Sequence, residues 1–363
     1  RRKQRATSPS ALAALAQQIR GVVTNVEDAI AAVIYEPDAE MAARALQLAP
    51  RAVLAEDIDS LLAHDQLDCL LIASPNFCHV DHLEAIAARV SLPILVEKPL
   101  FSDPADWRRV EAFKRDYSAP VWVAMEYRYM PPMQQFLSRA ESATGGIKML
   151  TIVEHRYPFL QKVGNWNRFN RNSGGTLVEK CCHFFDLMRL ALKSDPVRVM
   201  ASAGQMVNHL DETYEGETPD IWDCGYVLVD FASGARAALE LSMFADGSQF
   251  QEMIHAVGSE GKLEVKVPGP ARLWTGPQDR RPVAQLIDSP RAACNPVTIE
   301  CPVDETILAA GDHNGSTYYQ HQKFLEVVRG SGGVEVTLDD GIWAVRMGQA
   351  AQNSATNGQA VLL

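Results

Sequence analysis

The apolar positions in the first third of the chain fall into short runs separated by amphipathic stretches. These runs predict strands at Ile30–Tyr35, Ala52–Leu54, Asp68–Ala73, Ile94–Val96 and Val121–Met125. The amphipathic stretches between them predict helices at Ala39–Leu48, Ile58–His64, Val80–Arg89 and Pro104–Tyr117. Strands that alternate with helices are typical of a doubly wound parallel sheet, which makes this part of the chain an α/β unit.

After Met125 the pattern changes to longer alternating runs, which are typical of antiparallel strands. They predict strands at Ile147–His155, Val197–Val207, Trp222–Phe231, Ala235–Phe244, Gln251–Val257 and Lys262–Val267. Hairpin turns are predicted at Ala232–Gly234 and Gly258–Gly261. Helices are predicted at Met133–Ala140, Thr176–Leu192, Thr317–Val328 and Asp340–Ala355. The acidic stretch Asn208–Asp220 is expected to be a loop.

A chain of 363 residues is too long for one ordinary core, so two domains are expected. We place the first at residues 1–124 and the second at 125–363. The second is an α+β domain with a large, mostly antiparallel, open-faced sheet.

The start of the chain lacks the usual opening of a dinucleotide-binding domain, which is a strand, a G-x-G-x-x-G turn and a helix. No glycine occurs before Gly21, and residues 1–18 are compatible with a helix. Our interpretation is that the first strand and its glycine-rich loop are absent, which would leave a gap in the middle of the sheet. The alternative is that Gly21–Thr24 supplies a replacement strand.

The composition excludes several classes of protein. A net charge of −11 argues against a nucleic-acid partner, and no apolar run has the length of a membrane span. The basic start of the chain, residues 1–5, has no apolar segment behind it and is not a secretory signal. Seven cysteines without a C-x-x-C pair indicate reduced thiols and a cytoplasmic location. Cys181-Cys182-His183 and His79-x-x-His82 lack a second ligand pair, so no metal site is predicted.

Lys98 is the centre of the predicted active site. The buried strand Ile94–Val96 is followed at once by Glu97, Lys98 and Pro99. Charged groups at the end of a buried strand lower the stability of the fold unless they bind a partner or a ligand there. In open α/β sheets, ligands bind beyond the carboxyl ends of the strands. The alternative for this tripeptide is a surface salt bridge.

A second informative stretch begins at Gly174-Gly175. In the predicted helix that follows, an apolar stripe is formed by Leu177, Cys181, Phe184, Met188 and Leu192. Glu179, His183 and Asp186 fall at i, i+4 and i+7 on roughly the opposite side. Oxidation of an alcohol needs a group that accepts the hydroxyl proton and another that holds the oxygen. His183 suits the first role and Lys98 the second.

Together, these motifs resemble those of the Gfo/Idh/MocA oxidoreductases, which include glucose–fructose oxidoreductase and inositol 2-dehydrogenase. The resemblance runs from about Ile30 to the C-terminus. It rests on Glu97-Lys98-Pro99, on Ser74-Pro75-Asn76 with His79, on Gly174-Gly175 through Glu179, His183 and Asp186, and on residues 336–354. It implies a Rossmann-type doubly wound sheet followed by an open-faced antiparallel sheet.

The resemblance also implies roles for individual residues. The expected catalytic residues are Lys98, His183 and Glu179. Lys98 would be the catalytic lysine and His183 the general acid/base, and Glu179 stands where the family motif usually has aspartate. The expected cofactor-binding residues are Glu36, Ser74, Pro75, Asn76, His79, Glu97, Lys98, Trp166 and Arg168. Glu36 would take the adenosine ribose hydroxyls and favour NAD over NADP. The expected substrate-binding residues are Tyr127, Arg128 and Asp186.

The sequence therefore predicts an NAD(P)-dependent oxidoreductase that transfers a hydride between nicotinamide and a secondary alcohol of a sugar, inositol or related cyclic polyol. One alternative is a non-catalytic NAD- or sugar-binding regulator on the same fold. Another is a glycosidase assisted by NAD through transient oxidation. The expected partners are a small-molecule sugar or polyol and further copies of the chain, as a homodimer or homotetramer that covers the open sheet face.

Overall fold

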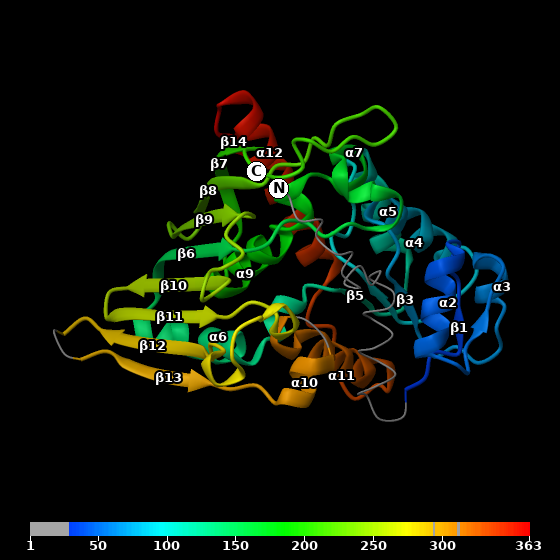
Figure 1. Ribbon diagram of the computed structural model, residues 1–363, viewed down its shortest axis with the longest axis horizontal. Helices are drawn as coiled ribbons and strands as arrows, with labels where there is room; N and C mark the ends of the chain where they lie inside the picture. Colours follow the sequence, from blue (N-terminus) through cyan, green and yellow to red (C-terminus); the bar gives the residue numbers. More distant parts are fainter. Residues whose placement is uncertain (1–28, 293–294, 311–312) are drawn as a thin grey trace.

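The computed structural model describes residues 29–292, 295–310 and 313–363 (Figure 1). The helix-compatible stretch at residues 1–18, the replacement strand at Gly21–Thr24 and the question of the first strand all lie outside the described residues. Among the helices of the described ranges, none combines the length and the apolar character needed to cross a bilayer.

The N-terminal part contains parallel strands in two pieces. The strands are β1 (Val33–Ile34), β2 (Val53–Leu54), β3 (Leu70–Ile72), β4 (Ile94–Val96) and β5 (Val121–Val123). β1 pairs with β2, and a separate sheet has the order β3-β4-β5. The helices between the strands are α2 (Ala39–Leu48), α3 (Ile58–Leu62), α4 (His79–Ala87) and α5 (Trp107–Asp116). Each lies where the hydrophobic pattern predicts it, within a few residues at its ends.

The second sheet has nine strands in the order β13-β12-β11-β10-β6-β9-β8-β7-β14. Their bounds are β6 Ile147–His155, β7 Pro196–Gly204, β8 Cys224–Phe231, β9 Arg236–Ser242, β10 Glu252–Gly258, β11 Gly261–Val267, β12 Ala284–Pro290, β13 Val297–Cys301 and β14 Val361–Leu362. Neighbours are antiparallel except for β6 and β9, which run parallel. The two predicted hairpins join β8 to β9 and β10 to β11.

The two edge strands, β13 and β14, and the strand β12 next to β13 are absent from the sequence-based prediction. β12 and β13 are mostly polar or half-exposed, and β14 has two residues. In such strands apolar and polar residues alternate only weakly, because hydrogen bonds to the neighbouring strand stabilise them more than an apolar face does. Here the partners are Val265 with Leu286 across β11 and β12, and Val199 with Val361 across β7 and β14.

Helices cover one face of the large sheet. Those that pack against it are α6 (Pro131–Thr144), α9 (Cys182–Leu192) and α12 (Leu338–Asn357). The other helices of this part are α7 (Asn170–Ser173), α8 (Thr176–Glu179), α10 (Glu305–Ala310) and α11 (Ser316–Val328), and α11 packs through Phe324 and Val327 in the core around the parallel strands. Short 3-10 helices are η1 (Asn76–Cys78), η2 (Pro104–Asp106), η3 (Glu126–Tyr129), η4 (Val163–Arg168), η5 (Ala271–Leu273), η6 (Gln278–Arg280) and η7 (His313–Gly315). In Figure 1 the large sheet lies on the left and the parallel strands on the right.

Helix α12 joins the cores of the two sheets. Its Val345 packs in the core around the parallel strands, whereas its Met347 packs in the core under the nine-stranded sheet. Just before this helix, the backbone carbonyl of Val336 accepts a 3.1 Å hydrogen bond from the amide of Val123 at the edge of β5. The end of the chain therefore completes the first core, and the boundary between residues 124 and 125 stays a prediction.

Candidate active site

Lys98 reaches from the end of β4 to the second part of the chain. Its Nζ donates a 2.9 Å hydrogen bond to the backbone carbonyl of Glu179, the last residue of α8. The Cys182 thiol donates to the same oxygen at 3.4 Å. Carbonyl groups at the end of a helix lack partners within the helix, so a cation there supplies one. The lysine and the Glu179–His183 segment, far apart in sequence, thus lie together.

The predicted single helix over Thr176–Leu192 is wrong. The structure has two helices, α8 and α9, separated at Lys180 and Cys181, where the ψ angle of Cys181 is −7°. A regular helix needs ψ near −42°, so the helix is interrupted there. The contacts of Lys98 and Cys182 with the Glu179 carbonyl satisfy the group that the break exposes. Leu177, Cys181, Phe184 and Met188 still form one apolar stripe in the core, as the spacing predicts.

Gly175, just before α8, permits a close approach to α12. Its φ angle is 85°, and an added Cβ would lie 2.2 Å from Nε2 of Gln352. From the other side, an added Cβ on Gly348 would lie 2.5 Å from the carbonyl oxygen of Leu177. Glycine is required where two helices meet this closely. The glycines thereby fix the position of α8 and of Glu179 at its end.

Glu179 is 2% exposed, and its carboxylate contacts a second lysine. Lys162, just before η4, places its Nζ 3.3 Å from Oε1 of Glu179 and 4.4 Å from the ring centroid of Trp166. Oε2 of Glu179 has no hydrogen-bond partner. Burial lowers the pKa of Lys162, and the nearby Lys98 lowers it further, while Glu179 opposes them. Lys162 is absent from the predicted site because no motif marks it; its place four residues before Trp166 is the only sequence signal.

His183 is buried and stacks on an aromatic ring. Its ring centroid lies 4.1 Å from that of Tyr127, with 7° between the planes, and its Nδ1 has no hydrogen-bond partner. Burial holds the pKa of His183 well below its ordinary value, and the positive charges of Lys98 and Lys180 act in the same direction. The imidazole is therefore neutral at neutral pH and has a nitrogen available for a proton.

Tyr127 is tied to Lys180. The Lys180 ammonium donates a hydrogen bond to the Tyr127 hydroxyl, and its Nζ lies 4.6 Å from the centroid of the Tyr127 ring. On another side, the His313 ring lies 4.7 Å from Tyr127. Lys180 and His313 are both absent from the sequence-based site. His313 precedes α11 in the chain and reaches the site only through tertiary folding. Substrate binding by Tyr127 stays a prediction.

Arg128 and Asp186 form a buried ion pair. Arg128 Nε donates to Asp186 Oδ2 at 2.6 Å, its Nη2 donates to the other carboxylate oxygen, and its Nη1 donates to the Glu335 carbonyl at 2.8 Å. This bidentate contact links η3, α9 and the segment before α12. The geometry thus gives both residues a structural function, and their predicted contact with substrate stays a prediction.

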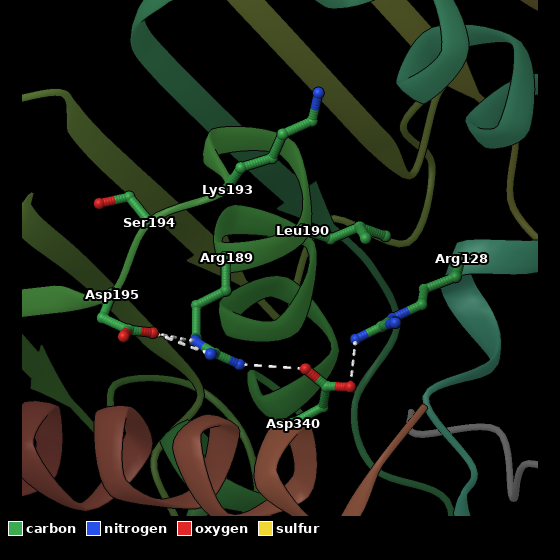
Figure 2. A pocket seen from close by; sticks show the side chains of 7 residues that line it. All are labelled: Arg128, Arg189, Leu190, Lys193, Ser194, Asp195 and Asp340. Atoms are coloured by element: carbon green, nitrogen blue, oxygen red, sulfur yellow. Dashed lines mark hydrogen bonds and ion pairs between the residues drawn. The ribbon is translucent and has the colours of Figure 1, made fainter. Parts of the chain in front are cut away.

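Arg128 also lines a pocket of about 310 Å³ (Figure 2). The other lining residues are Arg189, Leu190, Lys193, Ser194, Asp195 and Asp340. Its charges largely neutralise one another, since Arg189 pairs with Asp195 at 2.8 Å and with Asp340 at 3.1 Å. Lys98, Glu179 and His183 do not line this pocket, so it is separate from the group of residues around the lysine.

The predicted cofactor residues at the end of β3 contact the end of β4. The His79 ring lies between the carbonyl oxygens of Ser74, at 3.0 Å, and Pro99, at 2.8 Å. Burial lowers the pKa of His79 to about 4, so the ring is neutral and donates one hydrogen bond. Ser74 Oγ lies 3.0 Å from His82 Nδ1. His79 thereby holds together the two strand ends that carry the Ser74-Pro75-Asn76 and Glu97-Lys98-Pro99 motifs.

The same edge meets the second part of the chain. Asn76, which follows Pro75 in η1, donates through Nδ2 to the Ser173 carbonyl at 3.1 Å. Phe77 meets the Trp166 ring edge-on, with centroids 6.3 Å apart. These contacts bring the predicted cofactor-binding residue Trp166 to the strand end that carries the Ser74-Pro75-Asn76 motif.

The remaining predicted cofactor residues lie in three different settings. Glu97 Oε2 accepts a 3.1 Å hydrogen bond from the Lys98 amide. Arg168 is buried, donates through Nε to Glu212 at 2.9 Å, and has no partner at Nη1. Glu36 follows β1 and accepts from the Asp38 amide at 3.0 Å; burial raises its pKa.

These residues fit a nicotinamide cofactor on two observations. The Ser74 and Lys98 motifs lie at the carboxyl ends of parallel strands, where dinucleotides bind in doubly wound sheets. Buried polar atoms without partners, His183 Nδ1, Glu179 Oε2 and Arg168 Nη1, occur on the segments next to that edge. Among the described residues, no three His, Cys, Asp or Glu side chains are grouped to hold a metal ion.

Two family models match the chain. The model described as oxidoreductase family, NAD-binding Rossmann fold, matches residues 13–125. The model described as oxidoreductase family, C-terminal alpha/beta domain, matches residues 143–363. The chain belongs to the Gfo/Idh/MocA oxidoreductase family. The predicted family and fold class are both confirmed.

Relatives within the family include dehydrogenases. The inositol 2-dehydrogenase of Arthrobacter sp. (strain FB24) is 35% identical over 253 residues, which cover 68% of this chain and 71% of that enzyme. The inositol 2-dehydrogenase of Rhizobium meliloti (strain 1021) is 27% identical over 228 residues, which cover 62% and 66%. The matched part thus spans about two thirds of these relatives, 66% and 71%.

Solved structures of other oxidoreductases share the fold at low identity. A levoglucosan dehydrogenase in complex with NADH and levoglucosan has a TM-score of 0.74 at 19% identity, covering 97% of this chain and 95% of that one. An oxidoreductase domain protein from Kribbella flavida has a TM-score of 0.76 at 18% identity, covering 96% and 95%. At such identities the likeness concerns the fold alone.

Proposed function

We propose that the protein is an NAD(P)-dependent dehydrogenase that oxidises a secondary alcohol of a sugar, inositol or related cyclic polyol, or reduces the corresponding ketone. Inositol 2-dehydrogenases among its relatives, and the levoglucosan dehydrogenase with the same fold, support this substrate class. The free thiols of the six cysteines that the structure describes support a reducing compartment, and we infer the cytoplasm.

One observation carries the proposal: Lys98 Nζ lies 2.9 Å from the Glu179 carbonyl, and Glu179 comes four residues before a neutral, buried His183 whose Nδ1 has no partner. The Lys98 charge acts on the His183 ring, and a cation together with a neutral imidazole are the two groups that alcohol oxidation requires. A surface salt bridge, the alternative for Lys98, does not fit a side chain that contacts a buried helix end.

The residues divide the work as follows. His183 accepts the proton of the substrate hydroxyl, for which its lowered pKa keeps it in the unprotonated form. Lys98 donates to the same oxygen and stabilises its developing negative charge. Burial lowers the pKa of Lys98, but Cys182, Glu179 and Glu97 raise it and prevail, so the ammonium stays charged. The nicotinamide, when bound, accepts the hydride.

Glu179 is suited to bind substrate hydroxyls. Its Oε1 accepts from Lys162, while Oε2 is buried without a donor. An unpaired buried carboxylate oxygen is costly, and a hydroxyl group of a polyol would satisfy it. The extra methylene relative to aspartate extends the carboxylate further from α8.

For the cofactor we propose NAD rather than NADP. Glu36 follows β1, and one oxygen of its carboxylate is committed to the Asp38 amide. The other oxygen is suited to accept from a ribose hydroxyl, whereas a 2′-phosphate would meet a like charge.

The test is a spectrophotometric assay of NAD⁺ reduction with myo-inositol, glucose, xylose and levoglucosan as probes. We expect turnover with at least one probe, and we expect His183→Ala to lower kcat by roughly a hundredfold or more. Its NAD⁺ affinity, measured by calorimetry, should remain within about twofold because the imidazole acts on the substrate oxygen.

His64→Ala is the matched control, since His64 follows α3 away from the candidate site and its ring accepts a 3.3 Å hydrogen bond from the Gln66 amide. Equal activity of wild type, His183→Ala and His64→Ala would overturn the assignment of the base. A wild-type protein that binds NAD⁺ but oxidises no probe would instead favour a binding protein on this fold.

A further inference from the structure

Two carboxylates face each other in the buried layer under the site. Glu154 on β6 and Glu252 on β10 are direct partners across the antiparallel pair, with exposures of 0% and 2%. Gln251 Nε2 donates to Glu252 at 2.6 Å and lies 3.4 Å from Glu154 Oε1. Like charges directly opposite on a sheet repel each other. Burial raises the pKa of Glu252 to about 7, with the Glu154 charge acting in the same direction.

The positive charge of Lys180 offsets the negative charge of the Glu154–Glu252 pair. Its Nζ lies 2.8 Å from Glu154 Oε1, and Arg156 Nη1 lies 3.8 Å from the same oxygen. Lys180 is buried at the break between α8 and α9, so the break itself directs this side chain toward the sheet. A buried ammonium without such a partner would lose its charge or destabilise the fold.

The same ammonium holds the tyrosine on which the catalytic histidine rests. Lys180 donates to the Tyr127 hydroxyl, and the Tyr127 ring is stacked on His183 at 4.1 Å. No hydrogen bond fixes Nδ1 of His183. The stacking contact with Tyr127 is therefore a principal restraint on the orientation of this imidazole.

We propose that Lys180 and the Glu154–Glu252 pair position Tyr127, and through it the His183 ring, and that the charge of the pair sets how firmly Lys180 holds the Tyr127 hydroxyl. The positional part stands on the contacts alone, and its catalytic consequence rests on the proposed function. These three residues are positioning residues, because none of them needs to touch the reacting atoms.

The direction of the effect follows from the groups around the pair. The charged and titratable side chains that interact with it are Lys180, Arg156, Tyr127 and Cys181, while His183, His313 and Tyr157 lie next to these groups. As pH rises through about 7, Glu252 loses its proton and the pair gains a second negative charge. The ammonium is then drawn toward the carboxylates, and its hydrogen bond to Tyr127 weakens.

The test observes His183 directly, without substrate. The protein is labelled with [ε1-¹³C]histidine, and the His183 signal is assigned by its loss in His183→Gln. In the wild type the Tyr127 ring current displaces this signal. We expect Lys180→Met to shift it toward the position of an unstacked histidine, while Lys193→Met leaves it in place because Lys193 is 74% exposed.

Tyr127→Phe is the second variant, in case Lys180→Met does not fold. It keeps the ring and removes only the hydroxyl that Lys180 holds, so we expect the His183 signal to shift and broaden. An unchanged His183 signal in Tyr127→Phe would overturn the proposal, whatever happens to Lys180→Met.

The pH dependence of the His183 signal is a second test. Between pH 6 and 8 the chemical shift of this signal should change in the wild type and should stay constant in Glu252→Gln. An equal change of the His183 chemical shift in the wild type and in Glu252→Gln would show that the charge of the Glu154–Glu252 pair does not affect the His183 ring.

The kinetic readout separates this inference from the proposed function. With NAD⁺ and a probe polyol that the wild type oxidises, Tyr127→Phe should lower kcat roughly tenfold with little change in KM, as expected for a base that is misplaced rather than removed. If the wild type oxidises no probe, the proposed function fails while the NMR result still decides the positioning network.

Discussion

The ammonium group of Lys98 donates a 2.9 Å hydrogen bond to the backbone carbonyl of Glu179. Lys98, just after the parallel strand β4, thus supplies a hydrogen-bond donor for the last carbonyl of α8, a short helix in the part of the chain that forms the large sheet. His183 lies in α9, just after the break that follows Glu179, and the positive charge of Lys98 also acts on its imidazole. The same lysine therefore connects the parallel strands to α8 and influences the pKa of His183, the proposed base.

Removal of this charge should raise the pKa of His183. In Lys98→Met, we expect the His183 pKa to move up toward its ordinary value of 6.5, because burial still lowers it but one neighbouring cation is gone. A titration of the labelled histidine by NMR measures it, with Lys193→Met as the control. Turnover should fall roughly a hundredfold, the scale expected when an oxyanion donor is lost. A His183 pKa that is unchanged or lower would contradict the proposed coupling.

Glu36 should discriminate between the cofactors. Glu36→Ala is expected to weaken NAD⁺ binding by roughly 10–100-fold, the scale of one charge-assisted hydrogen bond, and to leave NADP⁺ binding equal or improved. Calorimetric titration with both cofactors measures the change. Glu40→Ala on α2 is the control, because that carboxylate is exposed and pairs with Arg44. Parallel losses for the two cofactors would show that Glu36 does not lie at the ribose.

The Arg128–Asp186 pair should contribute mainly to stability. Arg128→Met leaves the buried Asp186 carboxylate without its bidentate partner and should cost about 3–5 kcal/mol of unfolding free energy. Chemical denaturation measures this loss. Arg115→Met, on the exposed side of α5, should leave the free energy of unfolding nearly unchanged, because its ion pair with Asp116 is screened by solvent. A change in KM for the polyol with no loss of stability would instead support the predicted contact with substrate.

Glu252 should make the protein less stable as the pH rises. Its pKa of about 7 in the folded state exceeds the ordinary value of 4.5, so the folded state binds the proton more tightly. Stability then falls between about pH 4.5 and 7, and the loss is complete above that range.

Glu252→Gln removes this dependence. We expect it to match the wild type at pH 5 and to exceed it at pH 8 by on the order of 1–3 kcal/mol, a few degrees in Tm. Scanning calorimetry at the two pH values tests it. Glu300→Gln, at an exposed position of β13, should give the same Tm difference at both. If Glu252→Gln is destabilising at pH 8, the carboxylate is ionised and well compensated by Lys180.

The uncovered face of the large sheet should pair with a second copy. Met200 on β7 and Leu228 on β8 are direct cross-strand partners and are 44% and 55% exposed. Tyr226, on the same face, is 62% exposed. Sedimentation at micromolar concentration should give a dimer or tetramer, and Leu228→Lys should shift it toward monomer by at least about tenfold in Kd. Leu273→Lys is the control; a wild-type monomer would contradict the prediction.

Much of the fold follows from local patterns. The apolar run Ile94–Val96 and the alternation in Ile147–His155 each become a strand with the predicted bounds, because both are buried against a core that their own side chains form. The edge strand β13 is different. It is held mainly by hydrogen bonds to β12, and a backbone partner leaves no trace in side-chain pattern.

In the candidate site, too, some residues could be predicted from local sequence and others only from the tertiary structure. Residue type and spacing identified Lys98, Glu179 and His183, because an unpaired charge after a buried strand and a histidine one turn after a carboxylate are local signals. Lys162 and His313 carry no such signal, and long-range folding alone brings them to Glu179 and Tyr127.

The sequence by itself determined the family, the order of the main strands and helices, and the three residues at the centre of the proposed chemistry. Tertiary structure decided that the helix breaks between Glu179 and Cys182, so that Lys180 faces the Glu154–Glu252 pair and Lys98 reaches the exposed carbonyl. The reason is physical. Helical periodicity is a local property, whereas the groups that stabilise the break are Lys98, Glu154 and Glu252, which lie 25 to 81 residues from Glu179 in sequence.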